Sequence, residues 1–150
     1  MQWRAAGGKW TTKSAKGTTY TVKGLKTGTA YEFRVRGVSG LTKGAWSASA
    51  RRWLRGASKV KAAPGKKSGT VKVNWAKDAK ANAGHTVYVY AKRGGKAVKT
   101  VTVAKGKTAA TIKGLKAGKT YYVRVRPMRR ASGNTFSGLI CGYRAAKAAK

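Results

Sequence analysis

The chain has 150 residues, of which 41% are hydrophobic, so it can form one packed domain or two small ones. It carries 35 Lys and Arg residues against two acidic residues, and the resulting formal net charge of +33 opposes compaction and attracts polyanions. The basic residues are spread along the whole sequence, which excludes a neutral domain with one basic tail, and no apolar run is long enough to cross a membrane.

The N-terminal third of the chain is predicted to form short strands separated by turns rich in glycine and lysine. Residues 1–20 have no apolar stretch between a basic start and a small-residue cleavage site, so no secretory signal is expected there. Alternating polar and apolar residues predict strands over residues 2–5, 9–14, 19–22, 29–38 and 45–53.

A repeat links this first part to the rest of the sequence. Residues 23–37 read KGLKTGTAYEFRVRG, and residues 113–127 read KGLKAGKTYYVRVRP, at an offset of ninety positions. The same offset aligns Trp46 with Phe136 and Trp53 with Tyr143. One structural unit is therefore expected to occur twice.

The second copy has the two-residue period of half-buried antiparallel strands. Val71, Val73 and Trp75 alternate with polar residues, and so do Val123 and Val125. This pattern predicts strands over residues 59–63, 70–76, 85–92, 98–104, 109–113, 119–126 and 135–143. Residues 145–150 are expected to be a frayed tail. The predicted fold class is all-β.

These residues resemble a fibronectin type III domain of the bacterial or phage kind. The resemblance rests on a strand ending in Trp75, a strand with Val87 and Val89, and Leu115 followed six residues later by Tyr121. Leu115 and Tyr121 are similar to that family's tyrosine corner, in which the phenol hydroxyl bonds to nearby backbone. The resemblance implies two immunoglobulin-like β-sandwiches in tandem, a truncated one over residues 1–57 and a complete one over 58–150.

The first copy lacks its first two strands, because Trp3 already aligns with the middle of the third strand of the complete copy. An open sandwich leaves an apolar face and an unpaired strand edge. Three explanations remain open: the sequence is a fragment, a reduced sandwich is closed by Trp10, Trp46 and Trp53, or another chain donates the missing strands. Donation between copies would make the protein a homo-oligomer.

Few residues of the chain could support catalysis or bind a metal. The candidates are Glu32, Asp78, His85 and Cys141. Glu32 is interpreted as a cross-strand ion pair and Asp78 as a turn residue. His85 is interpreted as a partly buried histidine, and a single Cys cannot form an intrachain disulfide. Because no base faces a nucleophile and no three ligands cluster, we expect no enzymatic activity, metal site or cofactor.

A binding surface is a stronger hypothesis than a catalytic site. Outward aromatic and basic side chains on neighbouring strands can stack on bases or sugars and hold phosphate, or they can simply stabilise the sheet. The candidate outward face comprises Tyr88, Tyr90, Lys92, Tyr122, Arg124 and Arg126, with Trp3, Arg34 and Arg36 in the equivalent places of the first copy. Further basic residues, expected in solvated loops, are Arg51, Arg52, Arg55, Arg129 and Arg130.

Three functions are compatible with these features. The first is a non-enzymatic structural or binding module of an extracellular or virion assembly, which spaces, decorates or adheres and contacts protein neighbours and anionic surfaces. The family resemblance supports it. The second is a sequence-independent nucleic-acid binder, which the charge permits although no recognition motif is present. The third is a module that binds carbohydrate or an envelope polymer, which an exposed Trp10 or Trp46 would support.

Overall fold

The computed structural model describes residues 1–150 and consists of β-strands, turns and loops, which confirms the predicted all-β class. The strands are β1 (Gln2–Ala5), β2 (Thr11–Thr12), β3 (Ala30–Arg34), β4 (Val38–Ser39), β5 (Thr42–Lys43), β6 (Ala50–Gly56), β7 (Lys61–Pro64), β8 (Val71–Asn74), β9 (His85–Tyr90), β10 (Ala97–Val103), β11 (Ala109–Ile112), β12 (Thr120–Ala131), β13 (Asn134–Leu139) and β14 (Arg144–Lys147). No helix that could span a membrane is present.

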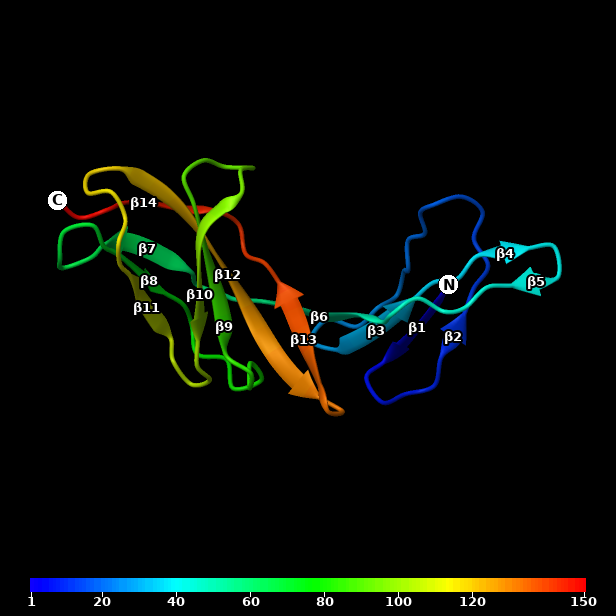
Figure 1. Cartoon of the computed structure of the whole chain (residues 1–150). Coiled ribbons are helices and arrows are strands. Elements are labelled where there is room, and N and C mark those ends of the chain that lie inside the picture. Colours follow the sequence, from blue (N-terminus) through cyan, green and yellow to red (C-terminus); the bar gives the residue numbers. More distant parts are fainter.

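The C-terminal part of the chain, residues 58–150, is a two-layer sandwich. One layer is the three-stranded sheet β11-β8-β7, and the other contains β10, β9 and β12 with β14 paired to β12 (Figure 1). The inward valines of both layers are fully buried against one another, as the two-residue period predicted: Val71, Val73, Val87, Val89, Val123 and Val125. This core is the main apolar cluster of the molecule.

The tyrosine corner predicted from Leu115 and Tyr121 is present. The Tyr121 hydroxyl accepts a hydrogen bond from the backbone N–H of Lys116 at 3.0 Å, and Leu115 packs against the core. The first copy repeats this contact, with the Tyr31 hydroxyl accepting from the backbone N–H of Lys26 at 3.0 Å. The repeat seen in the sequence is therefore a repeat of local structure.

A continuous sheet joins the two parts of the chain. Its strand order is β10-β9-β12-β13-β6-β3-β1-β2, and the parallel pairing of β13 with β6 forms the link, visible between the two lobes in Figure 1. Gly138 lies at this link, where an added Cβ would approach the carbonyl oxygens of Arg55 and Pro127 to 2.6 Å. Only glycine fits there without a shift of the backbone.

A small apolar cluster covers the same junction. Trp53 and Phe136 are fully buried, with Ala30 and Ala81 beside them. The Gly28 carbonyl oxygen accepts hydrogen bonds from Trp53 Nε1 at 3.0 Å and from Arg129 at 3.2 Å. Side chains from both parts of the chain therefore pack and bond together at the junction.

The N-terminal part, residues 1–57, has one sheet layer and no second layer over it. The strands β2, β1, β3 and β6 have no counterpart of the β11-β8-β7 sheet. The predicted strand at residues 19–22 is not formed. Its equivalent in the second copy, β11, is held by β8, and the N-terminal part contains no such partner.

Several predicted strand limits were wrong. The expected frayed tail contains β14, which pairs with Thr120–Val123 and buries Ala146 and Ala148. The strand predicted over residues 29–38 ends at Arg34, and a separate hairpin of β4 and β5 follows. The strand predicted to end at Arg126 continues as β12 to Ala131, because β13 pairs with its second half.

Candidate binding surface

The predicted outward residues of the second copy lie side by side on β9 and β12. The antiparallel register of these strands places Tyr90 opposite Tyr122 and Tyr88 opposite Arg124. Their side chains are half-buried and alternate with fully buried valines, so they stand on the face away from the core. Lys92 lies beyond the end of β9, in the exposed turn that follows it.

The arginines of this face stack on its tyrosines. The Arg126 guanidinium lies 5.4 Å from the ring centre of Tyr88, and that of Arg124 lies 4.7 Å from the ring centre of Tyr143. The Tyr143 ring also meets Tyr90 and Tyr122 edge-on, at centroid distances of 5.3 and 6.3 Å. We call this set, Tyr88, Tyr90, Tyr122, Arg124, Arg126 and Tyr143, the aromatic–arginine face.

Tyr143 was not predicted as part of this face. Its segment was assigned to one long strand, whereas the chain leaves β13 after Leu139 and returns to β12 as β14 only at Arg144. The alignment of Tyr143 with Trp53 gave no indication of this position, because Trp53 is buried at the junction. The connection between β13 and β14 therefore carries Tyr143 across the face.

In the N-terminal part, arginines and tryptophans alternate in a stack. The Trp10 ring contacts the guanidinium groups of Arg4 and Arg34, at 4.3 and 4.1 Å from the ring centre. The Trp46 ring contacts Arg34 at 4.8 Å and Arg36 at 4.3 Å. We call these five residues the arginine–tryptophan stack. Each indole already packs against two guanidinium groups, which is a favourable cation–π arrangement.

Trp3 does not lie on the same face as Arg34, contrary to the prediction that grouped them. Its neighbours Gln2 and Arg4 contact Arg34 and Glu32 across the β1–β3 pair. Since successive side chains of a strand point to opposite faces, Trp3 points to the other side of the sheet. Its ring lies 6.3 Å from that of Tyr20.

Both acidic residues of the chain are held by arginines. Glu32 is only 3% exposed, and its carboxylate bonds Arg4 at 2.7 Å and Arg51 at 3.2 Å, as expected for a cross-strand ion pair. Burial alone would raise the pKa of Glu32, but the hydrogen bonds and charges of Arg4 and Arg51 outweigh it and hold that pKa below its ordinary value. Asp78 bonds Arg55 at 2.5 Å and accepts the backbone N–H of Lys80.

The five further basic residues lie in strands, not in solvated loops, and have different environments. Arg51 and Arg55 on β6 form the ion pairs just described, and Arg129 on β12 stacks on Trp53 at the junction. Arg52 and Arg130 are exposed and have no carboxylate partner. Of the five predicted basic residues, three therefore make contacts within the protein and two face solvent.

The remaining candidates for chemistry lie apart from each other. No group of three His, Cys, Asp or Glu side chains is arranged to hold a metal ion. The Cys141 thiol forms hydrogen bonds with the backbone. Its sulfur accepts the N–H of Val125 at 3.0 Å and donates to the carbonyl oxygen of Gly142 at 3.2 Å. His85 is buried beside Trp75, at a ring distance of 5.0 Å.

Comparisons with known proteins agree with this architecture. The family model "Fibronectin type III domain" matches residues 1–52, and no curated protein matches the chain. A fibronectin-like protein from Clostridium thermocellum is 21% identical with a TM-score of 0.51, over 64% of this chain and 94% of that one. The fold is that of fibronectin type III domains.

A second solved structure, the FN1–FN3 domains of chicken CNTN1, is 16% identical with a TM-score of 0.51 and covers 99% of this chain. The chain spans 55% of that protein's structure. Fibronectin type III domains are in general non-catalytic binding or structural modules.

Proposed function

We propose that this chain is a non-enzymatic structural and binding module of an extracellular or virion assembly, where it contacts protein neighbours and anionic surfaces. The fibronectin type III fold supports a module of this kind. The charge supports an anionic partner, because a formal net charge of +33 attracts polyanions and repels other basic chains.

The aromatic–arginine face carries the proposal. Arg124 and Arg126 are held in place by Tyr143 and Tyr88, yet neither guanidinium has a carboxylate partner. Arg126 Nε is buried and has no hydrogen-bond acceptor in the protein. Within the chain, Arg126 donates only a long hydrogen bond of 3.5 Å to the Tyr88 hydroxyl, and Arg124 Nε donates to the Cys141 carbonyl oxygen at 2.8 Å. Each guanidinium carries five N–H donors, so both arginines keep donors that an anionic partner can accept from.

The test compares two variants that lose the same charge. Arg124→Gln with Arg126→Gln removes both guanidinium groups from the aromatic–arginine face. Lys66→Gln with Lys67→Gln removes two exposed charges from the turn between β7 and β8. Binding of poly-L-glutamate is measured by fluorescence anisotropy at 0.15 M salt. We expect the first variant to bind about tenfold more weakly than the second, since charge-assisted hydrogen bonds exceed the effect of diffuse charge. Equal losses would refute the role of the face.

The uncovered layer of the N-terminal part supports a protein neighbour. Val35 is exposed at the position whose equivalent in the C-terminal part, Val125, is covered by the second sheet. We assign this face to a pair of strands from an acidic neighbour, added by strand pairing. A second copy is a poorer occupant, because β7 and β8 already cover its own core and two such basic chains repel each other.

Light scattering coupled to size exclusion tests this choice on the chain as it exists. We expect a monomer at high salt, where repulsion is screened and association of copies would be easiest. A defined oligomer under those conditions would overturn the assignment to an acidic neighbour and would favour strand exchange between copies. Nuclease treatment beforehand removes nucleic acid that would otherwise bridge molecules.

Nucleic acid is the alternative partner that the charge permits. Basic residues give affinity for any polyanion through counterion release, so binding by itself decides nothing. Binding of duplex DNA is compared with binding of poly-L-glutamate of the same total charge. An affinity for DNA that is no higher than that for poly-L-glutamate would favour the acidic protein partner. The carbohydrate alternative is weakened, because Trp10 and Trp46 are half-buried and their rings pack against arginines.

A further inference from the structure

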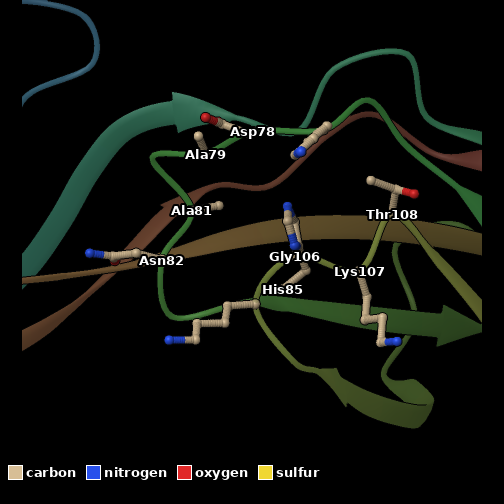
Figure 2. A pocket seen from close by; sticks show the side chains of 10 residues that line it. Asp78, Ala79, Ala81, Asn82, His85, Gly106, Lys107 and Thr108 are labelled. Atoms are coloured by element: carbon tan, nitrogen blue, oxygen red, sulfur yellow. The ribbon is translucent and has the colours of Figure 1, made fainter.

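A cavity of about 350 Å³ opens at one end of the C-terminal sandwich, away from the aromatic–arginine face. It is lined by the loop between β8 and β9, by the first residue of β9, and by the turn between β10 and β11. Figure 2 shows His85 in this cavity, with Thr108 and Lys107 on one side and Asn82 on the other.

His85 has no hydrogen-bond partner within the protein. It is 3% exposed, and neither Nδ1 nor Nε2 meets a donor or acceptor. The indole N–H of its neighbour Trp75 is likewise buried and unpartnered. A buried polar group without a partner is costly, so such groups are normally satisfied by a side chain, an ordered water or a ligand.

The wall of the cavity is strongly positive. Lys77, Lys105 and Lys107 line it, and none of them has a carboxylate partner. The one acid in the wall, Asp78, is bonded to Arg55. The Asn82 side chain is also occupied, because its amide bonds the backbone N–H and carbonyl oxygen of Arg130.

We propose that this cavity binds a small oxyanion, a carboxylate or a phosphate group, with an N–H of His85 donating to it and the three lysines supplying the charge. The unpartnered imidazole provides a directional donor at the base, and Thr108 adds a hydroxyl at the wall. A metal cation is a poor occupant, since three ammonium groups would repel it. The inference does not depend on the function proposed for the aromatic–arginine face.

The protonation of His85 is consistent with this role. Burial lowers the pKa of His85, and Asp78 opposes that shift only in part, while Lys77, Lys105 and Lys107 are the other charged groups at the cavity. The imidazole is therefore neutral near pH 7 and carries one N–H. A bound anion favours the imidazolium, so oxyanion binding is expected to raise the pKa of His85.

NMR spectroscopy can test the proposal, because His85 is the only histidine in the sequence and its ring signals are unambiguous. Inorganic phosphate and acetate are titrated separately at constant ionic strength, with chloride as the reference. We expect saturable shifts of the His85 ring signals with an oxyanion and none with chloride. In Lys105→Ala with Lys107→Ala the apparent Kd is expected to rise at least tenfold, whereas Lys66→Ala with Lys67→Ala is expected to leave it unchanged.

Each outcome has a defined meaning. Saturation by both ions assigns the site to carboxylates as well as phosphates, and saturation by phosphate alone assigns it to phosphate groups. The proposal would be overturned if chloride shifted the His85 ring signals as much as phosphate or acetate does. It would also be overturned if the apparent Kd were the same in the two double variants. Either result would leave water as the occupant of the cavity. All variants keep His85, so a folding defect of a buried substitution cannot obscure the result.

Discussion

Val35 and Val125 occupy equivalent positions in the two copies, yet Val35 is 54% exposed and Val125 is fully buried. The difference arises from what lies over each residue. Val125 faces the β11-β8-β7 sheet, whereas the layer that contains Val35 has no sheet opposite it. Equivalent sequence thus gives unequal burial, and β3 ends at Arg34, just before Val35, whereas β12 continues past Val125.

Truncation of these two valines should therefore have unequal effects. Val125→Ala removes buried methyl groups and leaves a cavity, for which we expect a loss of about 2 kcal/mol in the free energy of unfolding. Val35→Ala, the matched control, is expected to cost less than about 0.5 kcal/mol. Urea unfolding of both variants measures the difference, and equal costs would mean that the face around Val35 is covered in solution.

The tyrosine corner gives a second prediction. Tyr121→Phe removes the hydroxyl that accepts from the Lys116 N–H and should cost about 1 kcal/mol, the usual net value of one hydrogen bond. Leu115→Ala should cost about 2 kcal/mol or more, because it opens a cavity beside the core. Thermal unfolding measures both, and an unchanged melting temperature in either variant would contradict the assigned corner.

The junction between the two parts gives a third prediction. In Gly138→Ala the new Cβ would lie 2.6 Å from two backbone oxygens, so β13 and β6 must separate. We expect the junction to open, with a loss of about 2 kcal/mol or more and faster amide exchange in both strands. Gly37→Ala is the control, because nothing lies within 4 Å of its Cβ position. Identical exchange in the two variants would contradict the tight link.

Acid should destabilise the protein through Glu32. Its pKa is lower in the folded chain than the ordinary value of 4.5, so its contribution to stability is complete above that pH. This contribution is lost as the pH falls from 4.5 through the folded pKa. Stability measured by urea unfolding from pH 7 to pH 2 should fall less steeply below pH 4.5 in Glu32→Gln. An unaltered slope would mean that Arg4 and Arg51 do not favour the carboxylate.

The separate contribution of His85 has its own pH range. Because burial lowers the folded pKa of His85 below its ordinary value of 6.5, its contribution is complete above that pH and declines below it. This decline should persist in Glu32→Gln. Stability of Glu32→Gln that does not change below pH 6.5 would contradict the effect of burial on the pKa of His85.

Much of the fold was predictable because local patterns and tertiary contacts agree in the C-terminal part. Val71 and Val73, like Val123 and Val125, alternate with polar residues. These valines form the buried faces of the two sheets that pack against each other. The same kind of pattern failed at residues 19–22, where alternation is present but no neighbouring strand exists to pair with it. A strand needs a partner, and local sequence does not report whether one is present.

The candidate site was predictable only in its central strands. The pairing of Tyr88 with Arg124 follows from the two-residue period and the strand order of the family that the sequence resembles. Tyr143 reaches the face because it lies in the connection that leads from β13 to β14. Arg129 packs at the junction because β12 extends beyond the end that the sequence pattern predicted. Both depend on long-range packing, for which neither residue's neighbours in sequence give a signal.

The most direct test of the binding role keeps the net charge constant. Arg124→Lys with Arg126→Lys preserves +33 but replaces the planar guanidinium groups that stack on Tyr143 and Tyr88. Binding of poly-L-glutamate at 0.15 M salt is compared with that of the unaltered chain. We predict an affinity about fivefold lower or more, because the stacked, forked donors are lost. An unchanged affinity would show that diffuse charge alone accounts for binding and would contradict a specific role for the aromatic–arginine face.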